Sequence, residues 1–157
     1  MIKLTATFDF AESNGAGATV TNSISNLNFG NTDAPNIVPA SNPVTAGNNS
    51  YEKWFRGHFS GTYSSISNLK FYKSAGAYVT GESIVAEVNA SYATPVATTS
   101  IVATSAVPTS LGTALAPTAP GASPDYSGYI IMQLQTTVST PPGNVNTKTF
   151  TLQYDEA

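Results

Sequence analysis

The feature that most constrains the fold is a two-residue alternation of apolar and polar side chains. In residues 2–10, IKLTATFDF, apolar side chains at the even positions alternate with polar side chains at the odd positions. Successive side chains of a β-strand point to opposite faces of a sheet, so this period is typical of a strand buried on one face. No segment keeps the three- and four-residue apolar spacing of a helix without an interrupting Gly or Pro. The sequence therefore predicts an all-β fold.

Turn residues divide the chain into about eight short strands. Strands are expected at residues 2–10, 18–30, 51–60, 66–74, 78–90, 99–106, 128–139 and 147–154. Turn signals at roughly 8–12-residue spacing are typical of an all-β sandwich or barrel. We therefore predict a single-domain β-sandwich over residues 1–157, with jelly-roll and immunoglobulin-like topologies both open.

Two segments lack a clear strand pattern. Residues 31–50 contain three prolines and predict a long, extended loop. Residues 93–125 are rich in Ala, Thr, Pro and Ser, a composition that is also typical of a flexible linker. Because apolar residues recur in this stretch, we expect a strand at 99–106 followed by an arm-like connection at 106–125.

The composition excludes several functions. Charged residues make up 10% of the chain and the formal net charge is −3, whereas soluble domains have about 25% charged residues. Nucleic-acid binding needs a basic patch, and five lysines and one arginine are too scattered to form one. Cysteine is absent, so disulfide and thiolate chemistry are excluded.

Targeting signals are also missing from the sequence. No apolar run approaches the roughly 20 residues that span a bilayer, so no membrane partner is expected. The first residues alternate in polarity and lack the continuous apolar core of a secretion signal. Synthesis in a host cytoplasm followed by export inside a particle, such as a virion, would reconcile this with the uncharged surface. Earlier removal of a secretion signal would reconcile it equally well.

The stretch SYEKWFRGHFSG, residues 50–61, contains the only Trp, Arg and His of the chain. On a strand, Trp54, Arg56 and His58 share one face, while Phe55 and Phe59 share the other. Three interpretations are open for the first face: a covered structural face, a protein interface, and a platform for stacking sugars. Packing is favoured, because aromatic residues in strands usually pack against neighbours.

No constellation for catalysis or metal binding is found. A catalytic triad needs a nucleophile and an orienting carboxylate near His58, and a neighbouring serine is expected by chance in a Ser-rich chain. The acidic pairs Asp9 with Glu12 and Asp155 with Glu156 are better explained as surface acids than as Ca²⁺ ligands. We therefore expect no enzyme activity, no cofactor and no metal site.

Two stretches carry a resemblance to a known class of proteins. They are YEKWFRGHFSGTYSSISNLKFYKSAG at 51–76 and YIIMQLQTTVSTPPGNVNTKTFTLQYDEA at 129–157. Together they resemble small β-sandwich virion structural proteins of tailed bacteriophages, most closely the head decoration (cement) proteins. The resemblance covers about a third of the chain and includes no catalytic signature.

The resemblance implies a subunit on the capsid surface that binds the major capsid protein and copies of itself, with a homotrimer as one arrangement. The segments 31–50 and 106–125 are the expected contacts, since extended segments lose little entropy on docking. Two alternatives remain open. One is a neck, tail or fibre component of the virion, and the other is a carbohydrate-binding or adhesion module.

Overall fold

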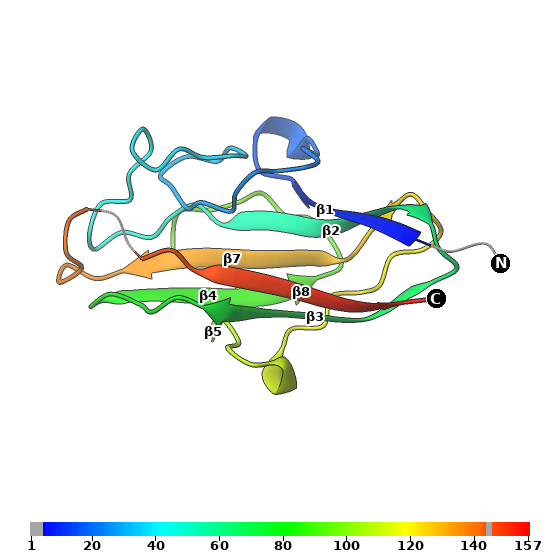
Figure 1. Ribbon diagram of the computed structural model, residues 1–157. Helices are drawn as coiled ribbons and strands as arrows, with labels where there is room; N and C mark the ends of the chain where they lie inside the picture. The colour runs from blue at the N-terminus through cyan, green and yellow to red at the C-terminus, as the bar shows by residue number, and fades with distance from the viewer. Residues whose placement is uncertain (1–4, 144–145) are drawn as a thin grey trace.

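The computed structural model describes residues 5–143 and 146–157, which form two antiparallel β-sheets packed face to face (Figure 1). The strands are β1 (Thr5–Glu12), β2 (Lys53–Thr62), β3 (Ile66–Ala75), β4 (Glu82–Asn89), β5 (Ser105–Ala106), β6 (Asp125–Tyr126), β7 (Tyr129–Thr136) and β8 (Thr149–Glu156). Two short 3₁₀ turns are η1 (Ala16–Ala18) and η2 (Leu111–Thr113). The prediction of an all-β sandwich of about eight strands is confirmed.

The two sheets differ greatly in width. The larger sheet has the order β1-β2-β7-β4-β5, and β6 also pairs with β2. The smaller sheet contains only β3 and β8. β2 pairs with β1 along its length, whereas its other edge pairs with β7 at 53–55 and with β6 at 58–59. The two-stranded sheet therefore faces a six-stranded one.

The core between the sheets is built by the alternating apolar side chains. Phe55 and Phe71 are fully buried on opposite sheets, with ring centroids 5.4 Å apart in an edge-to-face contact. Around them lies a cluster contributed mainly by β4 and β7, namely Ile84, Ala86, Val107, Ile130, Met132 and Leu134. The apolar period thus fixes which face of each strand is buried.

The strand expected at residues 18–30 is wrong. This segment is irregular apart from one bridge between Thr21 and Glu12. The amide of Asn28 donates to the Asn26 side chain at 3.0 Å, and Ser23 has a positive φ of 52°. The backbone N–H groups of Ser23 and Ser25 likewise donate to side chains, those of Asp9 and Asn36, and bonds of this kind replace the ladder of a strand. Residues 31–50 are irregular, as predicted.

The Pro/Ala/Thr-rich connection differs from the expected arm. Only Ser105–Ala106 of the strand expected at 99–106 forms a strand. Within 106–125, Leu115 exchanges two backbone hydrogen bonds of 2.8 and 2.9 Å with Phe71 of β3, and Val107 is 4% exposed in the core. The connection is therefore attached to the domain rather than free, because Pro108 and Leu115 bond to β3 and Asp125 pairs with β2.

We expect the Val107→Ala variant to lose about 2 kcal/mol of the free energy of unfolding, because two buried methyl groups are removed. Val138→Ala is the matched control, since Val138 is 89% exposed and surface changes stay within about 0.5 kcal/mol. Urea denaturation followed by circular dichroism measures both. Equal stabilities would contradict the packing of this segment.

Candidate binding surfaces

Trp54 lies in a covered face of the larger sheet. The side chain is 0% exposed, and its ring contacts those of Tyr92 and Tyr129 at centroid distances of 5.4 and 5.7 Å. Its Nε1–H donates to a Glu52 carboxylate oxygen at 2.9 Å. Residues around 92–103 cover this part of the sheet, and Ala103 packs in the same cluster. Trp54 is therefore a structural residue, in agreement with the packing interpretation. Its burial is not compatible with an exposed interface residue or a platform for sugars.

Arg56, two residues further along β2, lies between two aromatic rings. Its guanidinium carbon is 4.3 Å from the Tyr126 ring centroid and 4.4 Å from that of Tyr129. Among the described residues, its buried Nε has no hydrogen-bond partner. Cation–π contacts of this kind contribute about 0.5–1 kcal/mol each near a surface. Arg56 is thus held by rings rather than by a carboxylate.

His58 has a tethering role in this structure. Its Nδ1–H donates to Asp9 Oδ1 at 2.7 Å, and its ring stacks on Tyr126 at 4.7 Å. The other Asp9 oxygen accepts hydrogen bonds from the backbone and hydroxyl of Ser23. The imidazole therefore connects β2 with β1, with β6 and, through Asp9, with Ser23, and no Ser, Thr or Lys side chain within 5–143 and 146–157 is hydrogen-bonded to it.

An ion pair buried at the end of β1 was missed by sequence reasoning. Lys53 Nζ lies 2.5 Å from Glu12 Oε1, and the two side chains are 1% and 0% exposed. Burial raises the pKa of Glu12 and lowers the pKa of Lys53, while their mutual attraction opposes both shifts. Lys53 shares the strand face of Phe55. A lysine on that apolar face was the one feature of the sequence that could have indicated a buried charge.

Buried amide and carboxylate side chains extend this polar cluster. Asn14 accepts a hydrogen bond from the Trp54 amide at 2.8 Å and donates to the Glu52 carbonyl at 2.7 Å. The Glu52 carboxylate accepts from Ser100 and from the Val96 amide. These contacts join residues 52–54, at the start of β2, to irregular segments. The cluster is therefore a structural anchor for loops.

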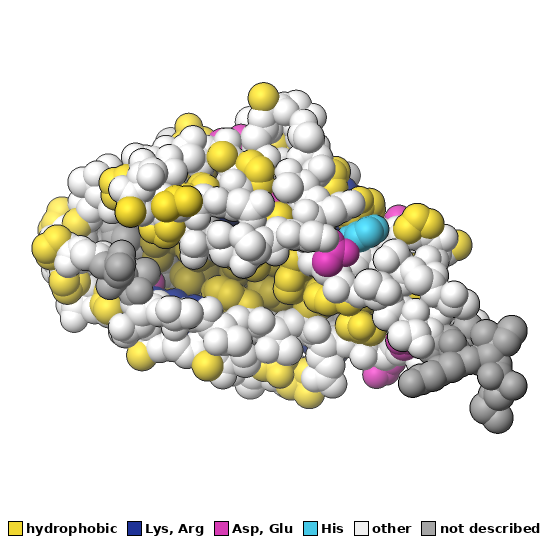
Figure 2. All heavy atoms as spheres, turned by 45° about the horizontal axis from the view of Figure 1, so that its top comes forward, with side chains coloured by type: hydrophobic (Ala, Val, Ile, Leu, Met, Phe, Trp, Pro, Cys, Tyr) yellow, Lys and Arg dark blue, Asp and Glu magenta, His cyan; other side chains and the backbone are white. Residues whose placement is uncertain are grey.

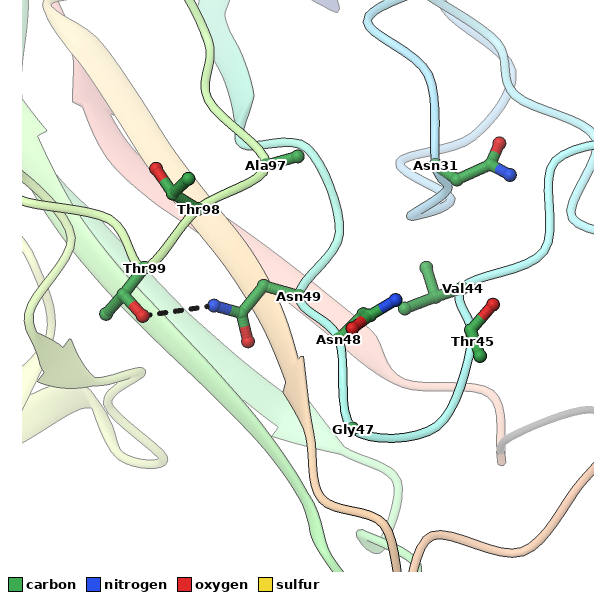
Figure 3. A pocket seen from close by; sticks show the side chains of 9 residues that line it. All are labelled: Asn31, Val44, Thr45, Gly47, Asn48, Asn49, Ala97, Thr98 and Thr99. Atoms are coloured by element: carbon green, nitrogen blue, oxygen red, sulfur yellow. Dashed lines mark hydrogen bonds between the residues drawn. The ribbon is translucent and has the colours of Figure 1, made fainter.

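A small pocket lies between the loop at 44–49 and the segment at 97–99 (Figure 3). Its volume is about 540 Å³ and its lining carries no charged or aromatic side chain. The Asn49 side-chain amide donates to Thr99 Oγ1 at 3.3 Å across one wall. With only hydroxyl, amide and small apolar groups, this pocket offers no chemistry for catalysis.

A groove of about 1190 Å³ opens between the two sheets. We call it the intersheet groove. Its floor includes Ile84 and Leu134 of the larger sheet, and its walls come from segments within 24–29, 38–46, 140–143 and 146–150. Figure 2 shows a long hollow with hydrophobic side chains along its floor. Leu27 and Phe29 of one wall pack against the main core cluster.

The groove is electrically neutral. Among its described lining residues only Glu82 and Lys148 are charged, and the Lys148 Nζ lies 2.5 and 2.6 Å from the two Glu82 carboxylate oxygens. Their side chains are 1% and 6% exposed. Because this pair is internally satisfied, the groove presents a mainly apolar surface to anything that enters it.

No family model, curated protein or solved structure matches this chain. Over the residues that the structure describes, no group of three or more His, Asp and Glu side chains could hold a metal ion. The same residues include no helix of the length and apolarity that crossing a membrane requires. The resemblance to phage decoration proteins therefore stays a prediction.

We expect Trp54→Ala to lower the free energy of unfolding by about 3–5 kcal/mol, because the change leaves a large cavity in a packed cluster. Arg56→Ala removes only two cation–π contacts and should cost about 1–2 kcal/mol. Chemical denaturation of both variants measures the difference. A Trp54→Ala protein as stable as the parent would show that the indole is not a core residue.

Because Lys53 and Glu12 are buried against each other, we expect the effects of replacing them on the free energy of unfolding to be strongly coupled. Glu12→Leu leaves a buried ammonium group without its carboxylate and should cost about 3–5 kcal/mol. The double variant Glu12→Leu/Lys53→Met removes both charges, and we expect it to recover at least half of that loss. A double-mutant cycle at neutral pH tests this, and purely additive losses would contradict it.

Proposed function

We propose that this chain is a structural protein of a virus particle, of the kind that decorates the head of a tailed bacteriophage. In this proposal it sits on the capsid surface, binds the major capsid protein and stabilises the shell. The observation that carries the proposal is the intersheet groove. Monomeric soluble proteins rarely leave large apolar surfaces open, and such surfaces usually bind another protein.

Several features support a binding role over a chemical one. The candidate residues Trp54, Arg56 and His58 are engaged in aromatic packing, a cation–π contact and a hydrogen bond to Asp9, respectively. The loop expected to make contacts, 31–50, supplies part of the groove wall through residues within 38–46. A cement protein needs rigidity and a surface for neighbours, and it needs no catalytic group.

The partners in this proposal are the major capsid protein and further copies of the chain. A homotrimer would give matched contacts at a threefold position. A position at the neck, tail or fibre would use the same groove and is the nearest alternative.

A carbohydrate-binding or adhesion module is the second candidate. Burial of Trp54 removes the stacking platform on which this candidate first rested. The cluster of Arg56 with two tyrosines, which is only half-buried, is the feature that still favours it.

We expect this chain to be present in purified virus particles at a copy number near that of the major shell protein. Particles from the source culture would be separated on a density gradient, and both proteins quantified by mass spectrometry against labelled peptides. A few copies per particle would move the proposal to the neck or tail. Complete absence from particles would overturn it and favour a glycan-binding assay with the Arg56→Ala variant.

A further inference from the structure

The hydrogen-bond pattern of β3 determines which backbone groups of β8 are free. Phe71 of β3 gives its N–H and C=O to Leu115, on the side away from β8. In an antiparallel pair, a residue that bonds away from its neighbour faces a residue that also bonds away. Phe71 faces Leu152, and Lys73 faces Phe150. The N–H of Lys73 donates to the Pro108 carbonyl, again on the side away from β8. The N–H and C=O groups of Phe150 and Leu152 therefore point to the outer edge of β8.

This outer edge of β8 is unpaired over its first half. Within residues 5–143 and 146–157, the backbone groups of Phe150 and Leu152 have no hydrogen-bond partner. By contrast, the outer edge of β1 is covered where Glu12 bonds to Thr21 and Phe10 to Ile24. An unpaired strand edge is a template for an additional strand.

The free edge lies directly beside the intersheet groove. Phe150 is one of the groove's lining residues, and Leu152 packs against the core at its floor. A strand added along this edge would turn every second side chain inward. Those side chains would enter the hollow that is open to solvent in Figure 2.

The groove also specifies the chemistry of the incoming side chains. Its only charges neutralise each other in the Glu82–Lys148 pair, so a charged group inserted there would lack a counter-ion. A second copy could pair its own β8 with this edge, but that strand has no free apolar side chains to insert into the groove. Phe150, Leu152 and Tyr154 are packed within their own sandwich.

We propose that the intersheet groove binds an extended segment of a different polypeptide, which adds as a strand beside β8 and inserts uncharged apolar side chains at alternate positions. This inference rests on the proposed function, because the segment would come from a neighbouring shell protein. The attachment in this proposal combines backbone pairing along β8 with insertion of side chains into the groove.

A peptide titration tests the mode of attachment. The probe is an acetylated and amidated six-residue peptide in which Val or Ile alternates with Ser or Thr. Two control peptides are a version with the same composition but grouped apolar residues, and a version N-methylated on the amides that would pair with β8. We expect the alternating peptide to slow amide hydrogen exchange at Phe150 and Leu152 about tenfold or more, and both controls to bind at least about tenfold more weakly.

A pair of matched variants locates the site. Val38 lines the groove and is 58% exposed, whereas Val138 is 89% exposed and lies outside the groove lining. Val38→Asp should weaken binding of the alternating peptide about tenfold, because it adds an uncompensated charge to the groove wall. Val138→Asp should change it less than twofold. Both variants replace surface valines, so a folded protein is expected in each case and is checked by thermal melting.

Three outcomes would overturn the proposal. The first is that millimolar peptide does not slow amide exchange at Phe150 and Leu152. The second is that the grouped or the N-methylated peptide binds as tightly as the alternating one. The third is that the chain alone forms a concentration-dependent dimer that Val38→Asp abolishes. The last would assign the groove to a second copy. If the chain is abundant in particles but fails this test, the decoration function stands and the strand-addition mode falls. If the peptide binds but particles lack the chain, the mode stands and the virion function falls.

Discussion

The buried ion pair between Lys53 and Glu12 holds the irregular segment between β1 and β2 against the sheets. Lys53 Nζ also donates to the Ala34 carbonyl at 2.9 Å, and the Asn36 amide donates to Glu12 Oε2 at 3.3 Å. The pair therefore uses its remaining hydrogen-bonding capacity on the loop that follows β1. Because no strand forms between Glu12 and Lys53, these bonds and those of Asn14 substitute for the ladder that a sheet would provide.

The groove is a consequence of unequal sheets. A two-stranded sheet cannot cover the inner face of a six-stranded one, so apolar surface beyond β8 must be covered by something else. Leu27 and Phe29 from the anchored loop cover part of it. The remainder is the intersheet groove, whose shape depends on the loop position that the Lys53–Glu12 pair maintains. Stability of the anchor and geometry of the binding surface are thus linked.

Local periodicity was sufficient to predict the fold class and most strands. Residues 2–10 and 147–154 alternate cleanly and 51–60 do so apart from Lys53 and Trp54, and each stretch contains most of an observed strand among the described residues. The failure at 18–30 has a local cause, since polar side chains there bond to backbone in place of strand pairing. Packing of Trp54 was the favoured interpretation, but the segment that covers it, 92–103, could not be predicted, because it is distant in sequence and has no strand pattern of its own.

At the candidate site, too, the sequence indicated the residues of one strand but not the distant segments that contact them. The sequence singled out Trp54, Arg56 and His58 by their rarity, and the structure gives each a packing or tethering partner from another segment. The groove arises from the relative placement of β8, the loops and the larger sheet, so no single stretch of sequence encodes it.

An unpaired strand edge beside an apolar hollow is normally a route to aggregation. Here the edge is restricted at one end, where the Ala6 amide donates to Glu156 Oε1 at 2.8 Å and the Phe8 and Tyr154 rings lie 5.8 Å apart. These contacts bring β1 and β8 together, so the free edge is limited to the first half of β8. The acidic side chains of Asp155 and Glu156 lie at the closed end and disfavour strands that would extend past it. A short edge of this kind accommodates one brief segment, which favours a specific partner over indefinite sheet growth.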